Sequence, residues 1–242
     1  MIGPYLAVLG VVAILIAVLQ KDLGQITVMA ATFLVLLILA GRSLKMFALL
    51  IASGLVVFVI LIITVPHRMA RLRSWWSMVQ DTFLSLFPDK MAGGLRVDAV
   101  REPYQIANAL NAFKNSDFWG QGLGAGQFKL GYLSEVHTDF VLAGMTEELG
   151  FLALVVVMLA MLFLLFRLFK ISASVENPVY YLFSAGIGLL ILFALIVNCY
   201  GISGMTPIKG IAVPFLSYGG SQTLANALAI GMVLMISKRR MQ

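Results

Sequence analysis

Six uncharged apolar runs divide the sequence, and they limit its fold more than any other feature. The runs cover residues 1–20, 23–41, 46–67, 149–166, 177–208 and 210–237. A helix rising about 1.5 Å per residue needs roughly 18 to 20 residues to cross a hydrocarbon core about 30 Å thick. Each run is close to this length or exceeds it. The sequence therefore predicts an all-α, polytopic membrane helix bundle with six transmembrane helices and one large extracytoplasmic loop.

The composition excludes several other classes of protein. With 61% hydrophobic residues, 12% charged residues and a mean hydropathy of +0.98, the chain is too apolar for a soluble globular domain. The single cysteine, Cys199, cannot form a disulfide within the chain, and two histidines do not favour a His-rich zinc site. In a membrane protein, a net charge of +6 indicates cytoplasmic basic loops and anionic ligands rather than nucleic acid.

Charges in the short loops predict how the bundle is oriented. The expected helices cover about residues 4–19, 26–40, 46–65, 140–170, 179–200 and 215–236. Two cations in the short loops, Lys21 and Lys209, fall on one side of these helices. Seven fall on the opposite side: Arg42, Lys45, Arg167, Lys170, Lys238, Arg239 and Arg240. The positive-inside rule then predicts a cytoplasmic C-terminus and an extracytoplasmic loop over residues 66–137. The first run has no basic n-region, and its abrupt start suggests that further chain precedes it.

Most of the charge lies in residues 66–150, which hold eight of the 17 Lys and Arg residues and nine of the 11 acids. In this stretch, Trp75, Trp76 and Trp119 are typical of anchors at a membrane interface. The apolar spacing over residues 104–113 predicts a short amphipathic helix. The glycines of residues 120–126 predict a tight turn close to another backbone. A dinucleotide loop is not expected there, because no strand precedes it.

Ionisable side chains beside apolar runs mark candidate sites, because a charge at a helix centre costs roughly 2.5 to 3.5 kcal/mol on insertion scales. Lys21 and Asp22 form either a solvated turn or a site. Asp139 either complements a helix N-terminus or binds a ligand. Glu147, about two turns into a span, should face a wet cavity or pair with a cation such as Lys129.

Two further groups of polar residues could bind a ligand. Arginines and aspartates alternate in the loop: Arg68, Arg71 and Arg73 with Asp81, then Arg96, Asp98 and Arg101. Arginine forks suit a diphosphate, and a carboxylate among them can act as a general base; the alternative is an ordinary charged loop. At the outer end of the last expected helix, Ser217 and Tyr218 precede a glycine pair, a pattern typical of helix starts that line binding cavities.

Several motifs resemble, in order, those of the SEDS family of shape, elongation, division and sporulation membrane proteins. Residues 20–24, QKDLG, resemble its QPDLG motif, with Lys21 in place of proline. Residues 104–105, 118–124, 129–140 and 147–150 resemble its longest shared block, and residues 204–221 its C-terminal signature. Residues 71–76 and 206–210 most resemble the cell-division branch. Family members have about ten spans, so the resemblance implies one SEDS-type domain over residues 1–242 that lacks the first four spans.

The resemblance implies a peptidoglycan glycosyltransferase that polymerises lipid II at the outer face of the bacterial cytoplasmic membrane, at the division septum. The implied partners are lipid II, a class B penicillin-binding transpeptidase and other divisome membrane proteins. Two alternatives stay open. One is a lipid II flippase or transporter in which Asp22, Glu147 and Ser217 line a headgroup path. The other is a non-catalytic scaffold for a transpeptidase.

The family's catalytic acid lies six residues before a Tyr-Gln pair and ten residues after an arginine. Counting back from Tyr104 gives Asp98, and counting on from Arg71 gives Asp81, so the loop carries an insertion of about 17 residues. We favour Asp98, because the helix at Tyr104 should fix its position directly, and Asp81 is the rival. The acid would deprotonate the acceptor 4-hydroxyl in an inverting transfer.

The resemblance also implies residues that bind the substrate. A diphosphate leaves readily once its charge is neutralised, and the candidate cations are Arg73, Arg101 and Lys129, with a divalent cation, Mg or Mn, as a further candidate. No other cofactor is expected. The remaining substrate-binding candidates are His137, Asp139, Glu147, Asp22 and Ser217.

Overall fold

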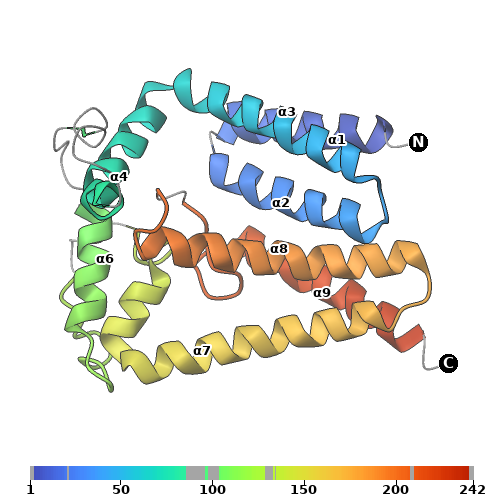
Figure 1. Ribbon diagram of the computed structural model, residues 1–242. Coiled ribbons are helices and arrows are strands. Elements are labelled where there is room, and N and C mark those ends of the chain that lie inside the picture. Colours follow the sequence, from blue (N-terminus) through green and yellow to red (C-terminus); the bar gives the residue numbers. More distant parts are fainter. Residues whose placement is uncertain are drawn as a thin grey trace. The chain divides into compact units, whose positions relative to one another are not determined.

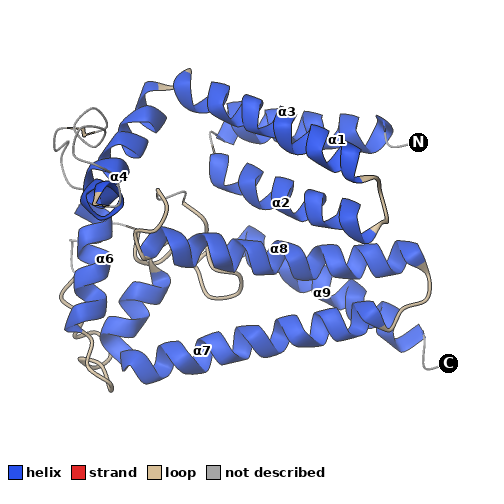
Figure 2. Ribbon diagram, in the orientation of Figure 1, coloured by secondary structure: helices blue, strands red, loops and turns tan. Residues whose placement is uncertain are grey.

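The computed structural model describes residues 3–20, 22–85, 96–97, 104–128, 133, 135–207 and 210–239 (Figure 1). Figure 2 shows helices joined by turns and loops, and the described residues contain no strand. The elements are α1 (Gly3–Leu15) with a π-helical turn (Ile16–Gln20), α2 (Leu23–Leu39), α3 (Leu44–Ile63), α4 (Pro66–Leu84), α6 (Tyr104–Asn115), α7 (Val141–Ala173), α8 (Pro178–Ile202) and α9 (Gly220–Arg239). The predicted all-α fold class is confirmed.

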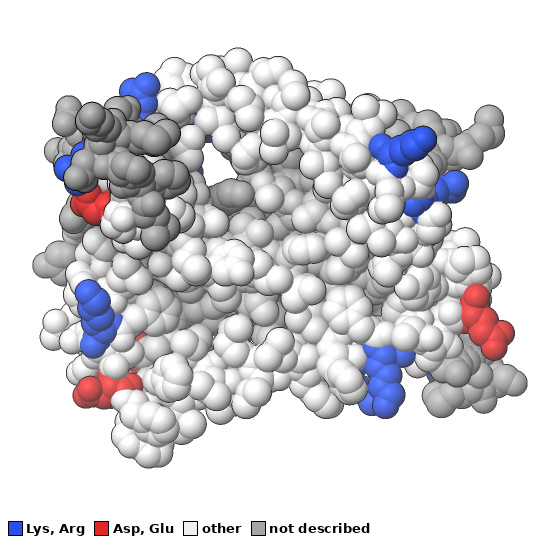
Figure 3. Space-filling view, viewed as in Figure 1, with Lys and Arg blue, Asp and Glu red and all other residues white. Residues whose placement is uncertain are grey.

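Four helices of the described chain are long and apolar enough to cross a membrane: α3, α7, α8 and residues 220–238 of α9. α2 is apolar but has 17 residues, and α1 has 13 before its π-helical turn. Each predicted apolar run therefore forms a helix, while the count of six spans stays a prediction. Most of the face in Figure 3 carries neither a basic nor an acidic side chain, as expected for a chain of this composition.

The described part of the predicted loop over residues 66–137 contains two helices, α4 and α6. α6 confirms the predicted amphipathic helix, since Ile106 and Ala109 are buried along one side of it. α4 was not predicted, because Pro66 was interpreted only as the end of the preceding helix. Instead, Val65 is extended and Pro66 occupies the first turn of a new helix, where its missing N–H costs no hydrogen bond. The extracytoplasmic position of this region stays a prediction.

The chain forms two compact units. The first comprises Met1–Phe47, Met158–Asn198 and Lys209–Gln242. Its core joins Val28 of α2, Ala194 of α8 and Ile211, with Phe193 and Val197 packed beside them. Glycines on α8 allow close packing here: a Cβ on Gly186 would lie 3.3 Å from Leu36, and one on Gly188 would lie 3.0 Å from Phe169. Small residues that let helices approach are typical of membrane bundles.

The second unit comprises Ala48–Val157 and Cys199–Ile208. In it, α4 packs against the turn that follows α8: the Trp75 indole N–H donates to the Gly204 carbonyl at 2.8 Å. A Cβ on Gly204 would lie 2.9 Å from Met78 and 3.3 Å from Ile106 of α6. Trp75 therefore serves a contact within the protein. Trp119 is 74% exposed, and its role as an interfacial anchor stays a prediction.

The last helix begins later than predicted. α9 starts at Gly220 rather than near residue 215, because a hydrogen-bonded turn precedes it. In this turn the Val213 carbonyl accepts from the N–H groups of Leu216 and Ser217, and Phe215 has a φ of 65°, outside the helical region. The apolar run alone could not reveal this turn.

Candidate functional site

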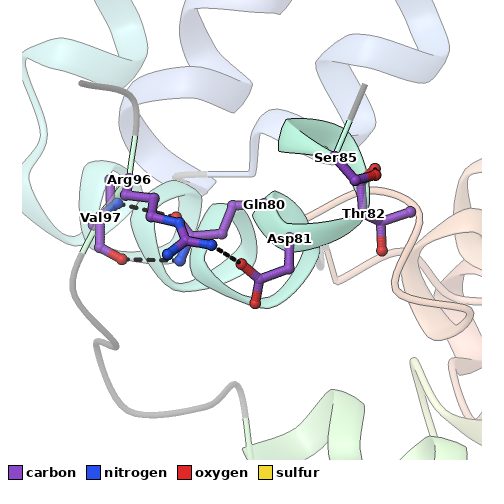
Figure 4. A network of polar contacts seen from close by, with 6 residues as sticks. All are labelled: Gln80, Asp81, Thr82, Ser85, Arg96 and Val97. Carbon is purple, nitrogen blue, oxygen red and sulfur yellow. Dashed lines mark hydrogen bonds and ion pairs between the residues drawn. The ribbon is translucent and has the colours of Figure 1, made fainter. Parts of the chain in front are cut away.

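A buried glutamine and an exposed ion pair connect α4 to residues 96–97 (Figure 4). Gln80 is 9% exposed, and its carboxamide both accepts a hydrogen bond from the Val97 backbone and donates one to it. The Val97 N–H donates to Gln80 Oε1 at 2.9 Å, and Gln80 Nε2 donates to the Val97 carbonyl at 3.0 Å. Next to this pair, Arg96 Nη2 donates to Asp81 Oδ1 at 3.2 Å. The structure thus brings one candidate catalytic aspartate together with an arginine of the loop.

The Asp81 carboxylate is accessible from outside the protein, because its side chain is 77% exposed. Its role as a general base stays a prediction. Arg73 is also exposed on α4. The favoured base Asp98 and the candidate cations Arg101 and Lys129 lie outside the described residues. The choice between the two aspartates therefore stays a prediction.

Glu147 is completely buried in the first turns of α7. Its Oε1 accepts the backbone N–H groups of Gln127 at 2.7 Å and Phe128 at 3.2 Å, and the Asn115 side-chain amide at 3.5 Å. Its Oε2 has no hydrogen-bond partner among the described residues and faces Gly126, where a Cβ would lie 3.0 Å away. The carboxylate thus ties the loop before α7 to the helix, and its predicted role in substrate binding stays a prediction.

α7 is broken at Gly150, which has a φ of 82° and a ψ of 175°. In a continuous helix, the carbonyls of Glu147 and Glu148 would accept from Phe151 and Leu152. The loop over residues 117–122 supplies the missing partners instead. Glu147 and Glu148 accept from Gln121 and Gly122, both at 2.9 Å, while Phe151 and Leu152 donate to Asp117 and Phe118, both at 3.3 Å.

This break explains the first of the glycines of residues 120–126. Gly120 has a φ of 77°, and a Cβ there would overlap the backbone of Glu148 and Gly150. The predicted tight turn against another backbone is confirmed, and the backbone is that of α7. Backbone groups freed by a helix break must find partners when they are buried.

Two other candidates take part in local hydrogen bonds. Asp22 is the N-cap of α2, since its Oδ1 accepts from the N–H groups of Gly24 at 2.8 Å and Gln25 at 3.1 Å. Ser217 is buried, and its Oγ accepts the Val213 N–H at 2.7 Å. These contacts give both side chains a structural role that needs no ligand.

His137 and Asp139 lie in the turn before α7. His137 is exposed and Asp139 is half-buried, and the turn is closed by N–H groups of Thr138 and Phe140 that donate to the Glu135 carbonyl at 3.2 and 3.1 Å. His137 is therefore accessible to a ligand. Its predicted role and that of Asp139 stay predictions.

A metal centre is not evident in the part of the chain that the structure describes. There, no group of three or more His, Cys, Asp or Glu side chains could hold a metal ion. The exposed carboxylate of Asp81 already pairs with Arg96. A Mg or Mn site stays a prediction, and no chemical step below depends on it.

Sequence reasoning missed Gln80 and Gly150 as residues that organise the site. Gln80 belongs to no motif, and its partner lies 17 residues further along the chain. Gly150 ends the Glu-Glu-Leu-Gly motif, but a glycine in an apolar run does not by itself predict a break. The signal that could have indicated this break was the presence of glycine in two motifs of the same shared block, residues 118–124 and residues 147–150.

The long apolar helices and the charged segments between them define a polytopic membrane protein. A family model described as a cell cycle protein, that of the FtsW, RodA and SpoVE proteins, matches residues 2–242. The chain belongs to this family, which confirms the resemblance predicted from the motifs.

Relatives of known name support the same assignment. The chain is 47% identical over 235 residues to the probable peptidoglycan glycosyltransferase FtsW of Helicobacter pylori, covering 97% of this chain and 61% of that protein. It is 38% identical to the protein of the same name from Nitrosomonas europaea, covering 96% and 56%. With the Escherichia coli O6:H1 protein the identity is 35%, covering 96% and 53%. The chain thus spans about half to three-fifths of the length of these relatives.

The fold is similar to that of one chain in a solved structure concerned with polymerisation and crosslinking by a peptidoglycan synthase complex. The TM-score is 0.63 at 23% sequence identity, and the match covers 98% of this chain and 62% of that chain. At this identity the likeness establishes the fold alone.

Proposed function

We propose that the protein is a peptidoglycan glycosyltransferase that polymerises lipid II into glycan strands at the outer face of the bacterial cytoplasmic membrane during septal synthesis. The names of its relatives support this activity. The observation that carries the proposal is the exposed ion pair of Asp81 and Arg96 near the end of α4, where a carboxylate and a guanidinium are both open to a ligand. Such a pair suits a hydroxyl acceptor and a diphosphate donor.

The proposed reaction is an inverting glycosyl transfer. A carboxylate, Asp98 or its rival Asp81, takes the proton of the acceptor 4-hydroxyl. The resulting oxygen forms a bond to the anomeric carbon of the donor, and the bond from that carbon to the diphosphate breaks. Undecaprenyl diphosphate leaves with the bonding electron pair. One base is sufficient, because a diphosphate is a good leaving group once cations neutralise its charge.

The cations that neutralise the diphosphate are proposed to be Arg73, Arg101 and Lys129. Arg73 is exposed on α4, the helix that carries Asp81. Arg96 joins this group, because it already lies against Asp81. Guanidinium groups suit this role, since their planar donors match phosphate oxygens in pairs.

The proposed partners are a class B penicillin-binding transpeptidase and other divisome membrane proteins, with the C-terminus in the cytoplasm. Polymerisation at the septum would need the new strands to be crosslinked nearby. A crosslinking partner is proposed because a chain with the same fold belongs to a solved structure concerned with polymerisation and crosslinking by a peptidoglycan synthase complex.

The test is lipid II polymerisation by the full-length protein with its cognate transpeptidase. Four proteins are compared in matched amounts: wild type, Asp98→Asn, Asp81→Asn and the control Asp117→Asn. Asp117 is an exposed aspartate of the same region, and only its backbone carbonyl takes part in a described hydrogen bond. We expect Asp98→Asn alone to lose glycan product.

Each other outcome has a distinct meaning. Loss with Asp81→Asn alone keeps the enzyme and moves the base. Loss with neither aspartate variant removes both candidate bases. A wild-type protein that makes no glycan while a known polymerase does so in the same mixture would rule out catalysis. Lipid II transport would then be measured, with Glu147 and Asp22 expected to be the sensitive positions, while a scaffold would tolerate every substitution.

A further inference from the structure

The link between Gln80 and Val97 resembles the pairing of two peptide groups. A glutamine carboxamide has one acceptor and two donors, so it can satisfy the N–H and the C=O of the same residue. At Val97 it does both, at 2.9 and 3.0 Å, in the view of Figure 4. We call this pair of hydrogen bonds the Gln80 clamp.

The clamp, rather than the ion pair beside it, can hold residues 96–97 against α4. The side chains of Arg96 and Asp81 are 64% and 77% exposed, and exposed ion pairs restrict their partners weakly. Gln80 is 9% exposed, so its two hydrogen bonds face little competition from water. Arg96 is covalently joined to Val97, and its guanidinium reaches Asp81 from a backbone that the clamp fixes.

We propose that Gln80 is a positioning residue, which fixes the backbone of Val97 and thereby aims Arg96 at Asp81. This inference rests on the proposed glycosyltransferase function. Gln80 itself touches no substrate in this scheme. Gln80 acts indirectly: its hydrogen bonds hold Val97 and so position the neighbouring Arg96, while α4 carries Asp81 next to Gln80.

The clamp is also next in sequence to both candidate bases. Asp81 directly follows Gln80, and Asp98 directly follows Val97. Loss of the clamp should therefore reduce the rate whichever aspartate is the base. Misplacing a reacting group by about 1 Å can reduce a rate roughly a hundredfold.

The experiment compares Gln80→Met, Gln80→Glu and the control Ser85→Ala in the full-length protein with its cognate transpeptidase. Methionine has a similar length and forms neither hydrogen bond. Ser85 lies just after α4, and its Oγ donates to the Thr82 carbonyl at 2.8 Å. We expect Gln80→Met to lower kcat roughly tenfold to a hundredfold and to change KM for lipid II less than about threefold, with Ser85→Ala unchanged.

Gln80→Glu supplies a readout that a merely structural role would not move. A carboxylate can accept the Val97 N–H but cannot donate to its carbonyl, whereas a neutral carboxylic acid does both. Glutamic acid has a pKa of about 4.3 in water, and burial favours the neutral form. The rate of Gln80→Glu divided by that of wild type should therefore rise, by about threefold or more, between about pH 8 and about pH 5.5. The same ratio for Gln80→Met should stay constant.

The remaining outcomes separate the inference from the function on which it rests. A Gln80→Met protein as active as wild type overturns the positioning role, while the enzyme stands. A loss in Gln80→Met without the acid recovery of Gln80→Glu also overturns it, because restoring both hydrogen bonds to Val97 then fails to restore the rate. Absence of glycan from wild type and Ser85→Ala alike removes the proposed function, and the inference falls with it.

Discussion

The backbones of Gly120 and Gly150 touch, and a Cβ on either residue would overlap main-chain atoms of the other. Both glycines also have positive φ, at 77° and 82°. Side chains are therefore excluded twice, by conformation and by space. This contact is the point where the loop over residues 117–122 enters the break in α7.

The first prediction concerns this contact. Gly120→Ala and Gly150→Ala should each destabilise the protein by roughly 2–5 kcal/mol, the sum of a left-handed backbone cost and an overlap cost. Gly124→Ala is the matched control, because Gly124 has a φ of 79° but nothing within 4 Å of its added Cβ. It should cost about 1–2 kcal/mol. Thermal unfolding in one detergent ranks the three variants, and equal losses would show that space does not matter.

The second prediction concerns Glu147. Glu147→Ala should remove the acceptor of two backbone N–H groups and cost roughly 1–3 kcal/mol in total, because these partly buried donors lose their partner. Glu147→Gln keeps an oxygen in the same place and should retain more of the stability. The control is Glu135→Ala, on an exposed glutamate, which should change stability by less than about 0.5 kcal/mol. Identical unfolding midpoints for the Ala and Gln variants at position 147 would contradict the tethering role.

The third prediction separates the two roles of Asp22. As an N-cap, it should tolerate Asn, which also caps well, whereas Asp22→Ala should cost about 1 kcal/mol. The measurements are the unfolding midpoint and glycan synthesis for both variants. If Asp22→Asn kept its midpoint but lost synthesis, the side chain would act on a ligand as well as on α2.

The fourth prediction concerns the indole of Trp75. Trp75→Phe keeps most of the ring but removes the donor to the Gly204 carbonyl, at a cost of about 1 kcal/mol. Trp119→Phe is the control, since Trp119 is 74% exposed and should change stability by less than about 0.5 kcal/mol. Unfolding followed by circular dichroism compares the two. A larger effect at Trp119 would contradict the internal role of Trp75.

The sequence predicted the apolar helices because a membrane demands long uncharged runs, and such runs are visible without any knowledge of packing. α6 was predicted for a similar reason, from the spacing of residues such as Ile106 and Ala109. α4 was missed because its residues mix charge with aromatic side chains and begin at Pro66, which also ends helices.

The parts of the site that escaped prediction depend on contacts between distant residues. Nothing near Gly150 reveals that its helix is broken, because the partners of the freed backbone groups lie about 30 residues earlier in the chain. Gln80 forms hydrogen bonds with the backbone of Val97. Because any residue other than proline offers the same backbone groups, this contact produces no sequence motif. Asp22 was identified as a candidate, but the sequence could not decide between cap and ligand.

The break in α7 also determines how this helix can meet a bilayer. An unbroken helix of its 33 residues would be roughly 50 Å long, well beyond a hydrocarbon core of about 30 Å. The break leaves residues 151–173, roughly 35 Å long, as the portion that matches the core. Glu147 and Glu148 lie before this portion, and their backbone carbonyls accept hydrogen bonds from the loop over residues 117–122. The contact between Gly120 and Gly150 thus lies at the boundary between the acidic start of α7 and the residues that the hydrocarbon core can surround.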